Sequence, residues 1–173
     1  MNSSTIPSTF VRDRVLLTWE EALWGVEHLL IDTSTVVDLA TDRLLAGSDD
    51  PVEIELAALP KSEISEAGDL LRRLADTEPA HSATEIARKW LFLRMAWIYE
   101  RRGDLQDPLG EAESAYADFG YPREVEGFMR YMPATWGYAP KTHTREENEA
   151  RLYRLWQQYL AAAAREFGKD DGF

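Results

Sequence analysis

Acidic side chains are the groups of this chain most able to do chemistry, and several of them are spaced so that they lie together. Asp38 and Asp42 are four residues apart, which places both carboxylates on one face of a helix. Asp49, Asp50 and Glu53 cluster at the expected start of the next helix. Such groups bind Lys and Arg of a partner or supply part of a metal site. The alternative interpretation is a solvated acidic face, in which Asp50 and Glu53 only cap a helix.

Other chemistry is hard to find in the sequence. The three histidines, His28, His81 and His143, lie far apart and show no i, i+4 pairing of a helical zinc site, and cysteine is absent. The glycines form neither a phosphate-binding loop nor a dinucleotide fingerprint, and no Gly-x-Ser-x-Gly motif occurs. We therefore expect no cofactor, no metal and no enzymatic activity. An enzyme whose site is assembled from carboxylates of several helices is an alternative.

Negative charge is concentrated in the first half of the chain. The net charge is −12, and residues 1–80 hold 16 Asp/Glu against 6 Lys/Arg, whereas residues 81–173 hold 15 against 13. An acidic surface repels nucleic acids and anionic membranes and attracts basic proteins. We therefore expect a basic protein partner, no nucleic acid and no membrane.

The elements that must position these side chains are all predicted to be helices. Capping boxes of the form Ser/Thr-x-x-Glu begin at Thr18, Ser82 and Thr144, and Asp-Pro pairs begin helices at Asp50 and Asp107. Apolar residues recur at helical spacing, and no segment alternates with period two for long enough to indicate a strand. The sequence predicts an all-α fold of seven or eight helices, over residues 18–30, 32–46, 50–59, 62–77, 82–103, 107–117, 122–131 and 144–167.

We expect these helices to form a single compact domain over residues 10–168, in antiparallel, solenoid-like packing. A soft subdivision is placed at residues 78–81, where the charge balance changes, and residues 1–9 and 169–173 are expected to be flexible. No apolar run is long enough for a membrane helix and no secretory signal is visible, so we expect a cytoplasmic protein.

Aromatic residues mark the segment from Tyr131 to Pro140 as an ordered loop. Trp136 and Tyr138 lie between prolines there, and large amphipathic rings on loops often anchor protein interfaces. The alternative is that the loop folds back and its rings fill the core.

Two segments carry a resemblance to a known family. Tyr116–Pro122 reads YADFGYP and Arg130–Pro133 reads RYMP. Together with Leu17–Trp19 and Trp90–Leu93, they resemble an uncharacterised family of small bacterial proteins, over residues 10–165. The resemblance implies no known activity, so no catalytic residue is carried over. Small acidic families of this kind are similar to immunity proteins that neutralise bacterial toxins, which is an analogy between classes.

The sequence therefore predicts a protein-binding module of the immunity type, which occludes a basic toxin domain. The expected partner-binding residues are Asp38, Asp42, Asp49, Asp50, Glu53 and Glu55, with Trp136 as an aromatic anchor. A helical adaptor or scaffold with a non-toxin partner is the alternative, and a homodimer is left open.

Overall fold

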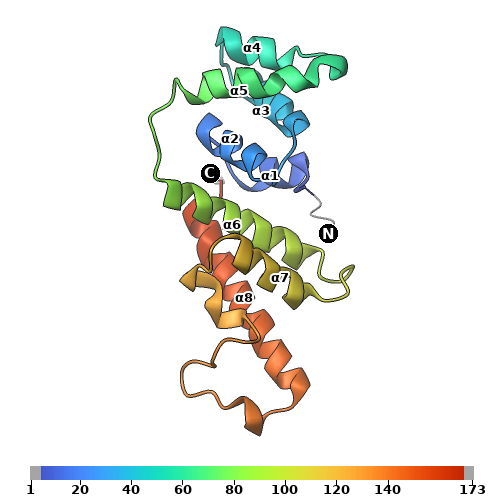
Figure 1. Ribbon diagram of the computed structural model, residues 1–173, viewed down its shortest axis with the longest axis vertical. Helices are drawn as coiled ribbons and strands as arrows, with labels where there is room; N and C mark the ends of the chain where they lie inside the picture. Colours follow the sequence, from blue (N-terminus) through green and yellow to red (C-terminus); the bar gives the residue numbers. More distant parts are fainter. Residues whose placement is uncertain (1–4, 170–173) are drawn as a thin grey trace. The chain divides into compact units, whose positions relative to one another are not determined.

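The computed structural model describes residues 5–169, which form eight α-helices and three 3₁₀ helices with no β-strand among them (Figure 1). This confirms the all-α class and the expected number of helices. The elements are α1 Ser8–Arg14, α2 Trp19–Glu27, α3 Thr33–Leu45, α4 Pro51–Ala57, η1 Lys61–Glu66, α5 Ala67–Ala75, α6 Ala83–Glu100, α7 Pro108–Asp118, η2 Arg123–Phe128, η3 Pro140–Thr142 and α8 Arg145–Phe167. Within residues 5–169, no helix is both long enough and apolar enough to cross a membrane.

Helix starts follow the predicted caps. Thr18 accepts a hydrogen bond from the backbone N–H of Glu21 at 3.1 Å, and the Glu21 carboxylate accepts one from the Thr18 N–H at 2.9 Å. Thr144 and Glu147 form the same reciprocal box at the start of α8. The N-caps of α3, α4 and α7 are the carboxylates of Asp32, Asp50 and Asp107.

Three helix ends share one backbone arrangement, in which a residue in left-handed conformation follows the last turn. Gly47 and Gly120 take this position with φ of 103° and 74°, as their places in the sequence predict. At the end of α2 the left-handed residue is Leu29, with φ of 57°. Helix α2 therefore ends at Glu27, before the predicted end at Leu30. The N–H of Leu30 reaches back to the Gly25 carbonyl at 2.8 Å, which satisfies a carbonyl that the helix end leaves open.

Two predicted α-helices are 3₁₀ helices over part or all of their length. Residues 61–66 form η1 before α5 begins, and residues 123–128 form η2 in place of the helix expected at 122–131. Each of these segments is six residues long, and short 3₁₀ segments are typical of connections and of the ends of α-helices.

The amino-terminal segment corrects a prediction. Residues 1–4 lie outside the described part of the chain, but residues 5–9 are not the flexible tail that was expected. Ile6 is 1% exposed and its N–H donates to the Leu30 carbonyl at 2.7 Å, and α1 begins at Ser8. Phe10 and Val11 on α1 are also buried, so apolar burial holds this segment in place. At the other end, the N–H of Lys169 donates to the Arg14 carbonyl, and residues 170–173 are not described.

The chain divides into two compact units within α6 and not at the predicted loop 78–81. Unit 1 comprises residues 1–90 and 169–173, and unit 2 comprises residues 91–168. In unit 1, α5 packs against α2, α3 and α4. Its core consists of Trp19, Ala22, Val36, Ala40, Leu56, Ala67, Leu70, Leu71 and Leu74. The solenoid-like arrangement concerns the whole chain and stays a prediction.

Unit 2 has its core around Trp156 of α8. The Trp156 ring stacks on Phe128 of η2 with 5.3 Å between ring centroids, and the ring of Tyr99 meets its edge at 5.1 Å. Helix α8 packs against η2, and the long loop of residues 129–144 joins these two elements. This loop carries the candidate site.

One close approach fixes the packing of unit 1. A Cβ atom at Gly25 in α2 would lie 2.2 Å from the ring of Trp90, whose Nε1 donates to the Glu21 carbonyl at 2.9 Å. Trp90 is fully buried, so its rigid ring has nowhere to move. Glycine at position 25 is therefore required by sterics.

We expect the substitution Gly25→Ala to lower the free energy of unfolding by about 3 kcal/mol, because the new methyl group overlaps the Trp90 ring. Gly68→Ala is the matched control, since a Cβ there meets only the Arg72 guanidinium, at 3.8 Å. The control is expected to gain about 0.5–1 kcal/mol from helix propensity. Urea unfolding followed by circular dichroism measures both, and equal effects of the two substitutions would contradict the steric explanation.

Candidate functional site

The predicted acidic surface is largely engaged by the protein itself. Arg12 of α1 donates from Nε and Nη2 to the Asp42 carboxylate at 2.6 and 2.5 Å, and its Nη1 lies 3.8 Å from Asp38. Ser8 donates to Asp38 at 2.6 Å. These hydrogen bonds from Arg12 hold the pKa of Asp42 below its ordinary value. Like charges four residues apart on a helix repel each other, and Arg12 of α1 offsets this repulsion between Asp38 and Asp42 of α3.

Glu53 is a correction to the expected surface, because it is only 5% exposed. Its Oε1 accepts a hydrogen bond from the Trp19 indole at 2.8 Å and lies 3.9 Å from Arg43. A partner cannot reach this carboxylate without unpacking α4. Asp50 is used as the N-cap of α4. Asp49 and Glu55 are exposed, with Glu55 3.7 Å from Arg73, and the side chains of Asp38 and Asp42 are 46% and 38% exposed beside Arg12.

Trp136 is the most exposed large apolar residue in the described chain, at 96%. Its backbone has φ of 60° and is followed by Gly137 with φ of 70°, so two successive residues are left-handed. A bulky residue in this conformation costs on the order of 1 kcal/mol. The alternative that the ring folds back into the core is wrong, and the loop presents an indole to solvent.

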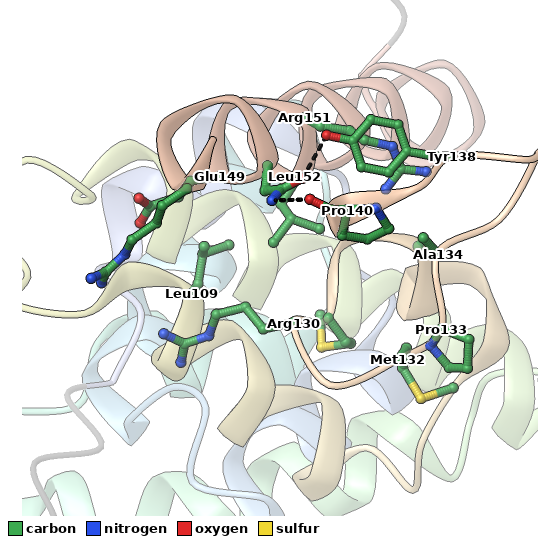
Figure 2. A pocket seen from close by; sticks show the side chains of 14 residues that line it. Leu109, Arg130, Met132, Pro133, Ala134, Tyr138, Pro140, Glu149, Arg151 and Leu152 are labelled. Atoms are coloured by element: carbon green, nitrogen blue, oxygen red, sulfur yellow. Dashed lines mark hydrogen bonds between the residues drawn. The ribbon is translucent and has the colours of Figure 1, made fainter. Parts of the chain in front are cut away.

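The Trp136 loop, residues 131–143, is held on α8 by two hydrogen bonds of the Asn148 side chain. Figure 2 draws them as dashed lines at Tyr138 and Pro140. The Tyr138 hydroxyl donates to Asn148 Oδ1 at 2.6 Å, and Asn148 Nδ2 donates to the Pro140 carbonyl at 3.1 Å. The Arg151 guanidinium lies over the Tyr138 ring, 4.2 Å from its centroid, and His143 stacks on the same ring. Trp136 is thus displayed by a loop whose neighbouring residues are fixed.

A pocket of about 290 Å³ opens beside this loop. Figure 2 shows side chains from α7, from the loop and from the first turns of α8 around it. Its apolar lining includes Leu109, Met129, Met132, Pro133, Ala134 and Leu152. Its polar lining consists of Arg130, Tyr138, Arg145, Asn148, Glu149 and Arg151.

Arg130 fixes the wall of the pocket to the start of α7. Its guanidinium donates to both oxygens of Asp107 at 3.0 and 2.9 Å and to both oxygens of Glu113 at 3.0 and 2.7 Å. The Arg130 hydrogen bonds lower the pKa of Asp107. These paired bonds have the geometry in which a guanidinium and a carboxylate interact most strongly.

The two motif segments of the sequence meet at this place. Tyr116 and Tyr121 come from the YADFGYP segment, and Tyr131 comes from the RYMP segment. The centroid of the Tyr116 ring lies 5.2 Å from that of Tyr121 and 6.2 Å from that of Tyr131. Arg130 and Met132 on either side of Tyr131 line the pocket. Sequence reasoning missed the pocket, although one signal was present, since residues 127–145 contain no Asp or Glu.

The histidines do not form a site, and no cluster of three or more His, Asp or Glu residues suited to a metal is found in residues 5–169. Each histidine contacts a different residue: His28 stacks on Trp24, His81 lies 2.9 Å from Glu20, and His143 stacks on Tyr138.

Comparison with known proteins gives one result. Residues 8–164 match the model of a family described as "Uncharacterized protein conserved in bacteria (DUF2247)", a range that contains both motif segments and the whole pocket. This agrees with the resemblance to an uncharacterised bacterial family. No curated protein and no solved structure matches the chain.

We expect Tyr138→Phe to loosen the Trp136 loop, because it removes the hydroxyl that bonds Asn148 and keeps the ring. Loss of one hydrogen bond corresponds to about 1 kcal/mol, so backbone amides of residues 134–143 should exchange hydrogen about fivefold faster. Tyr131→Phe is the control, because that ring packs on Tyr116. Unchanged exchange in the Tyr138 variant would show that the hydrogen bond from the Tyr138 hydroxyl to Asn148 does not hold the loop.

The bond between Arg130 and Asp107 predicts a pH dependence. Because the folded-state pKa of Asp107 is lowered, its contribution to stability is complete above the ordinary value of 3.8 and is lost as the pH falls through the folded value. Asp107→Asn keeps an N-cap and removes the charge. Since Asp107 is 55% exposed, the variant should lose about 0.5–1 kcal/mol at about pH 6 and less at about pH 3.

Urea unfolding at both pH values measures this difference. The control is Asp104→Asn, an exposed acid earlier in the same loop. A loss of the same size at both pH values would contradict the assignment of the lowered pKa to Arg130.

Proposed function

The chain belongs to this bacterial family, and we propose that it is a protein-binding module of the immunity type that acts in the cytoplasm. In this proposal it binds a basic toxin domain and covers that domain's functional surface. The observation that carries the proposal is Trp136, a fully exposed indole on a loop held by hydrogen bonds. Stability of the fold gives no reason for an apolar ring in water on a left-handed backbone.

An exposed indole on a fixed loop has the properties of an interface anchor. Burying a Trp side chain removes on the order of 150–250 Å² from water, and Trp is among the residues that contribute most to interfaces. Because Tyr138 and Pro140 are already bonded to Asn148, little loop entropy is lost when a partner binds. A contact at Trp136 is therefore expected to contribute strongly to affinity.

The charge of the chain supports a basic partner. Residues 1–90 hold 17 Asp/Glu against 8 Lys/Arg, so the excess of acid is in unit 1. Net charge acts over a longer range than individual ion pairs and raises the association rate of an oppositely charged protein. Glu53 is buried and Asp42 is hydrogen-bonded to Arg12, so the six predicted acids do not form one free patch. Attraction of a basic protein by the net charge of unit 1 does not require such a patch.

The helical adaptor with a non-toxin partner, the homodimer and the carboxylate-based enzyme are the competing proposals. An adaptor would also use Trp136, but its partner would have no toxic activity that the chain suppresses. A homodimer through Trp136 would appear as self-association of the purified chain. If the chain were an enzyme with a carboxylate-based site, substitution of Trp136 would leave its activity unchanged, because Trp136 would lie outside that site.

We expect Trp136→Ala to weaken binding of the natural partner at least about tenfold, which corresponds to about 1.4 kcal/mol. The partner is isolated on the immobilised full chain from lysate of the producing bacterium, and its affinity is then measured by calorimetry. Leu45→Ala is the control, because Leu45 is also a large exposed apolar residue, at 82%, and lies in unit 1. The partner's own toxicity, with and without the chain, distinguishes an immunity protein from an adaptor.

Two results would contradict the proposal. The first is that no protein is retained or that the retained protein is acidic and insensitive to salt. The second is that Trp136→Ala and Leu45→Ala bind the partner equally well.

A further inference from the structure

The size of the pocket beside the Trp136 loop limits what it can hold. Sites for small molecules and cofactors commonly measure about 300–1,000 Å³, and this pocket of about 290 Å³ lies at the lower end. A cavity of about 150 Å³ holds one benzene-sized group. The pocket therefore has room for one or two large side chains of a partner.

The floor of the pocket is suited to an apolar group. Leu109 and Met129 are each 1% exposed within the chain, and Met132, Ala134 and Leu152 complete the apolar wall. Methionine side chains adapt their shape to an incoming group, which makes them frequent in sites that accept varied peptides.

The charged groups at the pocket favour an anion. Three guanidinium groups, those of Arg130, Arg145 and Arg151, line it together with one carboxylate, that of Glu149. Arg130 already binds Asp107 and Glu113, so Arg145 and Arg151 are the groups that a ligand would meet. A guanidinium that stacks on an aromatic ring, as Arg151 does on Tyr138, keeps N–H groups at its edge for a carboxylate.

The local sequence has the same bias. Residues 127–145 contain Arg130, Lys141 and Arg145 and no acid, and the acids Glu146, Glu147 and Glu149 follow in the first turns of α8. The guanidinium groups of Arg145 and Arg151 attract an acidic segment, and Glu149 is the one carboxylate in the lining. The pocket thus differs in charge preference from the acidic unit 1.

We propose that this pocket is the docking site for a short acidic segment of the partner, in which an aliphatic or aromatic side chain stands beside Asp or Glu. The apolar side chain enters between Met132 and Leu152, and the carboxylate binds the guanidinium of Arg145 or Arg151. The inference rests on the proposed function, because it names the part of the partner that unit 2 contacts. A protein of net positive charge can present a local acidic segment, so the two proposals are compatible.

A library of random short peptides displayed on phage, selected on the immobilised full chain, tests the inference. We expect enriched peptides to carry an acid next to a large apolar residue. Ala134→Phe fills the pocket and should weaken these peptides at least about tenfold, whereas Ala162→Phe on an exposed part of α8 should not. Arg145→Glu should weaken them similarly, and Arg154→Glu, an exposed arginine outside the lining, is its control.

Several outcomes would overturn the inference. These are the enrichment of basic or wholly apolar peptides, the absence of any enriched peptide, and binding that Ala134→Phe leaves unchanged. A dimer in sedimentation that Ala134→Phe dissociates would show that a second copy of the chain occupies the pocket. If the natural partner is captured through Trp136 and Ala134→Phe has no effect on it, the inference fails while the proposed function stands.

Discussion

The side-chain amide of Asn148 is the contact on which the candidate surface of unit 2 depends. It accepts a hydrogen bond from the Tyr138 hydroxyl and donates one to the Pro140 carbonyl, so one group joins two points of the loop to α8. An amide can do this because it carries an acceptor and a donor together, whereas a carboxylate carries acceptors only. The capping box of Thr144 and Glu147 fixes the first turn of α8 and thereby the position of Asn148.

Local chemistry made most of the fold predictable. Caps at Thr18, Asp50 and Thr144 and the left-handed Gly120 depend on contacts within a few residues, and such contacts can be recognised in the sequence. The errors occur where distant residues decide. Helix α1 depends on the burial of Phe10 and Val11, which no local pattern requires, and η2 depends on the packing of Phe128 against Trp156.

The candidate site divides in the same way. Trp136 was identified because prolines and aromatic rings mark an ordered loop. Its ring is exposed, as an interface anchor in the unbound protein must be. The acids were harder to interpret, because Arg12 lies 30 residues from Asp42 and the indole that bonds Glu53 lies 34 residues away, in α2. Sequence reveals a charge but not its partner, so a cluster of acids predicts a free surface and buried or paired carboxylates equally well.

The distribution of charge constrains what can bind this protein. Attraction by net charge reaches about one Debye length, roughly 8 Å at physiological ionic strength, and does not depend on the details of any pocket. Binding at a pocket depends on the few groups that line it, here Arg145 and Arg151 around an apolar floor. A uniformly basic partner would satisfy the first requirement and fail the second. The two proposals together therefore describe a partner with a basic surface that also presents an apolar side chain next to an acid, and such a pattern is more specific than net charge alone.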